Sequence, residues 1–203
     1  MSPSENISKS VCVFCGSSSA VDQHYFDLAK ATGKAIAASG HRLVYGGGGV
    51  GLMGATAKAC HEAGGDVLGI IPEFLQTREI TYKDVPHEIV PDMHTRKQMM
   101  YDAADAFLIL PGGIGTLEEA VEVISWLRMN LHSKPIVFLD TDDYWTPIIT
   151  LISHTIDARF TPEWLRRHLH RTTDAQQAIN LILNEWENET DLEGEPIADP
   201  SKI

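Results

Sequence analysis

The chain has 203 residues, of which 43% are hydrophobic and 22% charged, which is enough for one globular domain with a sizeable core. Its 16 Lys and Arg residues against 28 Asp and Glu give a net charge of −12. Such a chain is poorly suited to binding duplex nucleic acid or anionic membranes, because binding to either requires a local excess of Lys and Arg. It has neither an apolar run of bilayer length nor an apolar signal segment at its start. We therefore expect a cytoplasmic protein that binds neither nucleic acid nor membrane.

Short apolar segments alternate with longer stretches of helical period along the chain. The expected strands lie at 11–15, 42–45, 66–71, 87–90, 106–110 and 135–139. The expected helices span about 22–40, 49–63, 93–104, 117–127, 144–157, 162–169 and 174–187. Because the strands are apolar at both parities, they should be buried on both faces, as in a parallel sheet. The alternation predicts a Rossmann-like, doubly wound α/β fold with helices on both faces.

We expect a single domain over residues 1–187, with residues 1–9 as a flexible tail. Residues 188–203 are expected to form an acidic, disordered C-terminal tail. The segment 185–203 contains seven acidic residues and one lysine, which together account for half of the net charge of −12.

The cysteines and histidines do not predict a metal site. Cys12 and Cys15 form a C-x-x-C, but in a strand residues three apart point to opposite faces. Only Cys60 remains, too few for a four-thiolate zinc site, so we interpret all three as buried structural thiols. The nine histidines contain no H-E-x-x-H motif, and we expect His168 and His170 on a solvated or dimer-facing helix. Neither a metal nor a cofactor is expected.

The first glycine-rich loop, YGGGGVGLMG at 45–54, contains Gly49-x-Gly51-x-x-Gly54, a match to the dinucleotide-binding fingerprint. It follows the second expected strand, whereas dinucleotide-binding folds usually carry this motif after the first. Glu73 lies near the position of a ribose-binding acid. A tight turn with close helix–strand packing explains several of these glycines equally well.

The second glycine-rich loop, PGGIGTLEE at 111–119, follows the strand at 106–110. Its glycines would let a phosphate approach the free N–H groups at a helix start, where Thr116 could cap the helix or donate its hydroxyl. Glu118, Glu119, Glu122 and Ser125 fall on the face opposite the apolar stripe. Acids in a first turn can simply offset the helix dipole, but three crowded carboxylates repel one another, which favours a functional cluster.

The segment MHTRKQMM at 93–100 opens the helix that leads into this strand. Arg96 and Lys97 could be a solvated basic patch. Since their helix feeds the strand that carries the second loop, we favour them as the counter-charge for an anionic ligand.

The pairing of MHTRK with PGGIGTLEE resembles the Lonely Guy family of cytokinin-activating phosphoribohydrolases. CGSSS at 15–19 and YGGGGVGLMG at 45–54 are also similar to signatures of that family, and the resemblance runs from about Val11 to about Leu151. It implies a Rossmann-like homodimer that hydrolyses the N-glycosidic bond of adenine-type nucleoside 5′-monophosphates. The products would be the free base and ribose 5-phosphate. Family members are often labelled lysine decarboxylases, but nothing in the sequence marks a lysine for pyridoxal phosphate.

The resemblance also assigns residues. The family's catalytic arginine and glutamate match Arg96 and Glu119. The positions that match its nucleotide-binding residues are Glu79, Lys97, Gly112, Gly113, Ile114, Gly115, Thr116, Leu117, Glu118 and Ser125, the last of which is often Thr elsewhere. The two N-terminal signatures add Gly16, Ser17, Gly47 and Gly48 as candidate phosphate-binding residues.

Two other functions stay open at this point. A non-catalytic nucleotide or cofactor carrier would need the glycine loops but not the pairing of Arg96 with Glu119. A nicotinamide-dependent oxidoreductase would depend on Gly49-x-Gly51-x-x-Gly54.

Overall fold

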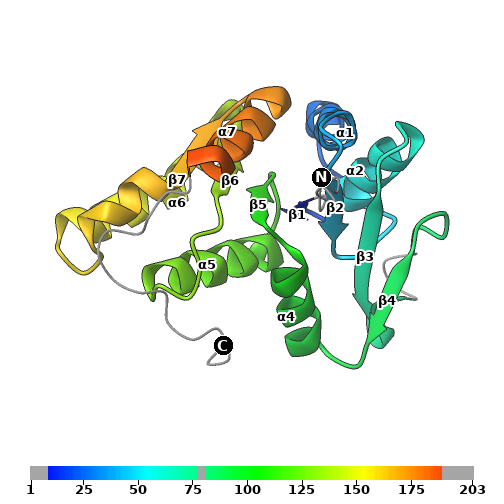
Figure 1. Cartoon of the computed structure of the whole chain (residues 1–203), viewed down its shortest axis with the longest axis horizontal. Helices are drawn as coiled ribbons and strands as arrows, with labels where there is room; N and C mark the ends of the chain where they lie inside the picture. The colour runs from blue at the N-terminus through cyan, green and yellow to red at the C-terminus, as the bar shows by residue number, and fades with distance from the viewer. Residues whose placement is uncertain (1–8, 77–80, 189–203) are drawn as a thin grey trace, which may run out of the picture.

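The computed structural model describes residues 9–76 and 81–188, which form a seven-stranded sheet surrounded by helices (Figure 1). The strand order is β4-β3-β2-β1-β5-β6-β7, and all six neighbouring pairs are parallel. The strands are β1 Ser10–Phe14, β2 Arg42–Tyr45, β3 Val67–Pro72, β4 His87–Val90, β5 Ala106–Ile109, β6 Ile136–Leu139 and β7 Leu169–Thr172. The predicted doubly wound α/β fold is confirmed.

Helices cover both faces of this sheet. The α-helices are α1 Gln23–Ala38, α2 Gly51–Glu62, α4 Met93–Ala103, α5 Ile114–Arg128, α6 Thr146–Asp157 and α7 Ala175–Asn188. Three short 3-10 helices join them: η1 Glu73–Leu75, η2 Thr141–Asp143 and η3 Glu163–His168. Side chains of α1, α2 and α7 share one hydrophobic core, and those of α4, α5 and α6 share the other. No helix among the described residues is long and apolar enough to span a membrane.

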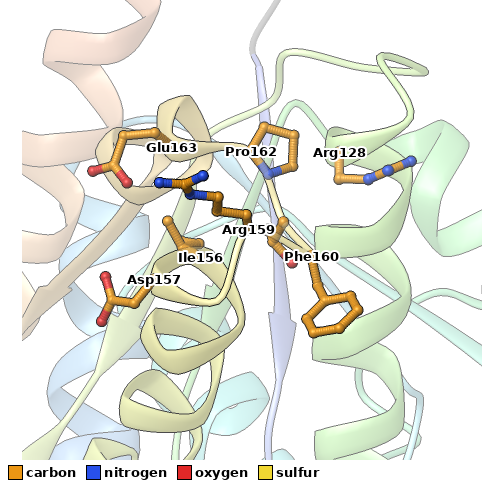
Figure 2. A pocket seen from close by; sticks show the side chains of 8 residues that line it. Arg128, Ile156, Asp157, Arg159, Phe160, Pro162 and Glu163 are labelled. Atoms are coloured by element: carbon orange, nitrogen blue, oxygen red, sulfur yellow. The ribbon is translucent and has the colours of Figure 1, made fainter.

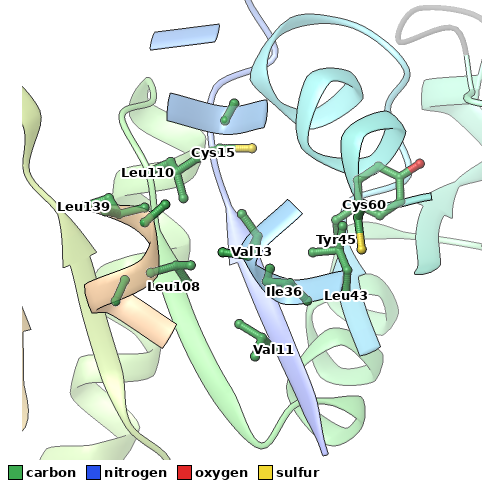
Figure 3. Close-up of a cluster of buried hydrophobic side chains, with 14 of the residues drawn as sticks. Val11, Val13, Cys15, Ile36, Leu43, Tyr45, Cys60, Leu108, Leu110 and Leu139 are labelled. Atoms are coloured by element: carbon green, nitrogen blue, oxygen red, sulfur yellow. The ribbon is translucent and has the colours of Figure 1, made fainter. Parts of the chain in front are cut away.

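Alternation along β1 divides its side chains between the two cores. Val11, Val13 and Cys15 contribute to the core shown in Figure 3, whereas Cys12 and Phe14 contribute to the core on the opposite face. A strand buried on both faces is mainly apolar, and β1 is buried throughout and apolar from Val11 to Phe14. The prediction that the two thiols of the C-x-x-C point apart is thereby confirmed, and all three cysteines are buried and form no disulfide.

The C-terminal part differs from the prediction. The helix expected at 162–169 is the 3-10 helix η3, followed by the strand β7, which pairs with β6. His170 therefore lies in a strand, where its Nε2 is 3.3 Å from Oε1 of Glu185 on α7, so the expected solvated or dimer-facing helix is wrong. Edge strands such as β7 are only partly buried, so polar residues there obscure the strand pattern. Of the expected tails, only Lys9 and Asn188 lie within the described residues.

The sheet has its topological switch point between β1 and β5. β1 pairs with β2 on one side and with β5 on the other, and the chain builds outward from there in both directions. In folds of this type, ligands bind outside the carboxyl ends of the strands where the winding reverses. The loops after β1 and β5 are therefore the place to look for a site.

Candidate active site

The loops after β1 and β5 touch each other at the switch point. The backbone N–H of Gly16 donates to the carbonyl of Pro111 at 3.1 Å. A cavity of about 330 Å³ opens beside them, between the ends of these strands and the helices α4 and α5. This volume is within the usual range of small-molecule pockets. The second glycine-rich loop forms part of its wall.

Helix α4 supplies one wall of the cavity. Asp92 caps the helix by accepting a hydrogen bond from the N–H of Thr95 at 2.8 Å, which fixes where the first turn begins. Met93, Arg96 and Met100 then follow at intervals of three and four, so they share one helix face, and all three line the cavity.

Arg96 and Glu119 form a buried ion pair in this cavity. Nη1 of Arg96 donates to Oε1 of Glu119 at 2.9 Å, and Nε of Arg96 donates to the carbonyl of Ile70 at 3.3 Å. The two residues are 7% and 8% exposed and both line the cavity, so each charge depends on the other for compensation. The sequence placed these residues 23 positions apart, and the fold brings them into direct contact.

The surroundings of Glu119 shift its protonation equilibrium. Burial raises the pKa of Glu119 above its ordinary value, and the adjacent Arg96 guanidinium opposes this shift. A carboxylate with a raised pKa, set in a cavity beside a fixed positive charge, is typical of a residue that handles protons or stabilises a cation.

The other two acids of α5 have a different environment. Nζ of Lys97 donates to Glu118 at 2.6 Å and to Glu122 at 2.9 Å. This lysine neutralises the repulsion that the sequence indicated among the three carboxylates. The prediction of one shared face is wrong for Glu119, which is buried in the pair with Arg96. Lys97 itself does not line the cavity.

The N-terminus of α5 faces the cavity with no side chain capping it in the described structure. Gly113 is the N-cap residue, and a Cβ added there or at Gly115 would meet no atom within 4 Å. Neither residue has the positive φ that requires glycine. Protein packing thus leaves these two glycines unexplained, whereas open space above free N–H groups at a helix start suits an anion.

The first glycine-rich loop serves the protein's own packing. A Cβ on Gly46 would lie 2.0 Å from Nη2 of Arg96, so this glycine makes room for the guanidinium. Gly47 has φ +79 and packs against Ile71, and Gly48 forms a β-bridge with Thr81. Gly47 and Gly48, expected to bind phosphate, do not line the cavity.

The structure brings together about half of the predicted site residues. Those that line the cavity are Arg96, Glu119, Gly16, Ser17, Gly113, Ile114, Gly115, Thr116 and Glu118. Those that do not are Lys97, Gly47, Gly48, Gly112, Leu117 and Ser125, and Glu79 lies outside the described residues. The lining residues that sequence reasoning missed include Gly46, Met53, Leu75, Met93 and Met100. The spacing of Met93 and Met100 around Arg96 was a signal that could have identified two of them.

A larger cavity, of about 640 Å³, lies between the end of α5 and the segment that joins α6 to η3 (Figure 2). Helices that follow parallel strands end at the amino edge of the sheet, away from the switch point. The acids Asp157 and Glu163 of this cavity both pair with Arg166, at 2.8 and 3.1 Å. The described residues contain no group of three or more His, Cys, Asp or Glu that could hold a metal ion. The smaller cavity at the switch point is therefore the better candidate site.

The fold and this site define a class: a Rossmann-like α/β protein with an open glycine loop at the switch point and a buried Arg–Glu pair. A family model described as "Possible lysine decarboxylase" matches residues 53–182. The chain is 47% identical over 175 residues to the cytokinin riboside 5′-monophosphate phosphoribohydrolase LOG5 of Arabidopsis thaliana, covering 86% of this chain and 77% of that protein. An enzyme of the same name from Rhodococcoides fascians is 42% identical over 176 residues, covering 86% and 89%.

The chain belongs to the Lonely Guy family. Among solved structures, the Moco carrier protein of Chlamydomonas reinhardtii superposes with a TM-score of 0.68 at 18% identity, covering 89% of this chain and 99% of that one. At this level of identity the likeness concerns the fold alone.

Proposed function

We propose that this protein hydrolyses the N-glycosidic bond of adenine-type nucleoside 5′-monophosphates, including AMP and N6-substituted forms, and releases the free base and ribose 5-phosphate. The single observation that carries the proposal is the arrangement of one cavity. An uncapped helix start with two unobstructed glycines lies beside a buried Arg–Glu pair. The names of the relatives, cytokinin riboside 5′-monophosphate phosphoribohydrolases, supply the substrate class.

The 5′-phosphate is assigned to the start of α5. Backbone N–H groups at a helix N-terminus bind phosphate through their partial positive charge. Gly113 and Gly115 leave the space that a phosphate needs, and Thr116 lines the same wall. Binding energy from this remote group would hold the anomeric carbon in a fixed position relative to the catalytic residues.

Glu119 is assigned to the reacting bond. When a purine N-glycoside breaks, positive charge develops on the ribose and the base leaves with excess electron density. A buried carboxylate would stabilise the oxocarbenium-like sugar and could orient or deprotonate the attacking water. Arg96 is a poor proton donor, because a guanidinium stays charged, so we assign it to anion binding and to electrostatic stabilisation of the leaving group.

We infer that the protein works as a homodimer with its sites near the interface. Ile114, at the rim of the cavity, is 81% exposed, and Val121, seven positions further along α5, is 44% exposed, so the two share one helix face. A second subunit would cover such an apolar face. Light scattering after size-exclusion chromatography should give twice the chain mass of 22.4 kDa. A mass of one chain at micromolar concentration would contradict the dimer.

Incubation with AMP and with isopentenyladenosine monophosphate tests the proposed reaction. Chromatography should detect free base and ribose 5-phosphate in equal amounts from both nucleotides. A folded protein that releases base from neither would contradict the proposal and favour a carrier. A nicotinamide-dependent oxidoreductase has less support. Gly51 and Gly54 of the dinucleotide-binding fingerprint are packed against backbone atoms of Ser17 and Gly49, which leaves no space there for a cofactor.

A further inference from the structure

Tyr144 contacts the second glycine-rich loop from outside the cavity. Its hydroxyl donates a hydrogen bond to the carbonyl of Gly112 at 2.6 Å. This contact exists because β6 lies next to β5, so the segment after β6 passes beside the loop after β5. Neither Tyr144 nor Gly112 lines the cavity, whereas Gly113 does.

The geometry of the peptide bond links this contact to the cavity. In a planar trans peptide, the carbonyl of Gly112 and the N–H of Gly113 point in opposite directions. Holding the carbonyl toward Tyr144 therefore turns the N–H of Gly113 away from it. A peptide between two glycines can rotate with little steric cost, so an outside contact is needed to select one orientation.

Tyr144 is held by a rigid support. The buried carboxylate of Asp140 accepts hydrogen bonds from the N–H of Trp145 at 2.6 Å and from the hydroxyl of Thr146 at 3.2 Å. Arg171 pairs with the same carboxylate at 2.9 Å. These contacts fix the backbone on the C-terminal side of Tyr144.

Contacts with α1 fix the same segment from the other side. Nε2 of His24 lies 2.9 Å from Oδ2 of Asp142. The ring of Tyr25 meets the ring of Tyr144 edge-on, with centroids 5.8 Å apart and planes inclined by 74°. The Tyr144 hydroxyl is therefore presented to Gly112 from a supported position, although the residue is 38% exposed.

We propose that Tyr144 is a positioning residue that orients the Gly112–Gly113 peptide, so that the N–H of Gly113 faces the 5′-phosphate of the substrate. This inference rests on the proposed function. Loss of one such hydrogen bond should weaken phosphate-bearing ligands by about two- to tenfold. Ligands that lack a phosphate should bind as before.

The test compares Tyr144→Phe with Tyr25→Phe. Both variants remove one hydroxyl from the same ring pair, and only Tyr144 bonds to Gly112. Calorimetry measures the affinity for ribose 5-phosphate and for adenine separately, without turnover. Thermal melting verifies that each variant is folded. We expect Tyr144→Phe to weaken ribose 5-phosphate about two- to tenfold and raise KM for AMP by a similar factor. Adenine affinity should not change, and Tyr25→Phe should match the wild type in all measurements.

Three results would overturn the inference. They are unchanged binding of ribose 5-phosphate to Tyr144→Phe, an equal loss for adenine, and a wild type that does not bind ribose 5-phosphate. A wild type that binds ribose 5-phosphate but releases no base from AMP would contradict the proposed function alone, and the calorimetric comparison would still decide the role of Tyr144.

Discussion

The two glycine-rich loops of this protein use the same residue for opposite purposes. In the first loop, a Cβ on Gly51 or Gly54 would lie 2.4 Å or 2.2 Å from backbone atoms. In the second loop, a Cβ on Gly113 or Gly115 would meet no protein atom within 4 Å. Glycines of the first kind let protein approach protein, and those of the second kind leave a surface for something else to approach.

The difference shows that position in the fold decides what a glycine motif does. The first loop contains the literal dinucleotide fingerprint, yet it follows β2, next to the switch point rather than at it. The second loop matches no dinucleotide fingerprint, but it follows β5 at the switch point, where α/β folds bind ligands. The two loops converge on the ion pair: Gly46 gives Arg96 its space, and the second loop begins the helix that carries Glu119.

The largest effect should come from Glu119→Gln. The amide keeps the shape and an oxygen that can accept from Arg96, but it loses the negative charge that would stabilise the transition state. We expect kcat for AMP to fall by about 10²–10³-fold with the fold retained. Steady-state kinetics measures kcat, and circular dichroism verifies that the fold is retained. Near-normal turnover would contradict a catalytic role for Glu119.

Gly46→Ala should have the next largest effect and shows how the first loop acts on the site. The new methyl would collide with the Arg96 guanidinium, a flexible side-chain end that can move, so activity should suffer more than stability. We expect kcat/KM to fall by about tenfold or more, because small misplacements of catalytic groups are costly. Gly40→Ala is a poor control, because Gly40 has a φ of +74. Ala55→Ser serves instead, because Ala55 is a partly buried residue of α2 that does not line the cavity. Equal losses in both variants would contradict this role of Gly46.

Gly113→Ala and Gly115→Ala test the second loop. Each methyl would enter open space, so the melting temperature should stay near that of the wild type, while ribose 5-phosphate binds about tenfold more weakly. Gly54→Ala is the contrasting variant, because its methyl meets the backbone of Gly49 and overpacking of this kind costs about 1–3 kcal/mol. If Gly113→Ala were instead the destabilised variant, the distinction between the two loops would be wrong.

The smallest predicted effect is a shift in pH dependence. Burial raises the pKa of Glu119 above that of an exposed glutamate, which is about 4.3. As the pH falls, Glu119 therefore becomes protonated, and loses its reactive carboxylate form, at a higher pH than an exposed glutamate would. The acid limb of kcat/KM should therefore lie above that value. The substrate phosphate also titrates, with a second pKa of about 6. Ribose 5-phosphate binding over the same range separates the two groups, and an acid limb at the ordinary glutamate value would contradict the environment described for Glu119.

Most of the fold could be predicted from sequence because its strands are apolar on both parities and its helices have clear periods. Six of the seven strands lie where the sequence predicts them; five of these are mainly buried and apolar, whereas the edge strand β4, HEIV, is mainly exposed. β7 does not lie at a predicted strand, because it is a half-buried strand in which Leu169 is followed by His170 and Arg171. Its identity depends on pairing with β6, a long-range contact that local periodicity does not encode.

The site was less predictable than the fold. Spacing and family resemblance identified Arg96 and Glu119, but helical periodicity grouped Glu119 with Glu118 and Glu122 on the face opposite the apolar stripe. Only the packing of α4 against α5 separates them, giving Glu119 to Arg96 and the other two acids to Lys97. Gly46 was likewise out of reach, because its function depends on a guanidinium 50 residues later in the chain.

The most direct test of the central claim is the ratio of kcat/KM for AMP to that for adenosine. The two substrates share the bond that breaks and differ only in the phosphate that the second loop is proposed to hold. We predict that the wild type cleaves AMP at least about a hundredfold more efficiently, and that Gly113→Ala lowers this ratio mainly by losing efficiency on AMP. Equal efficiency on both substrates would contradict the account, because the open glycines at the start of α5 would then contribute nothing to catalysis.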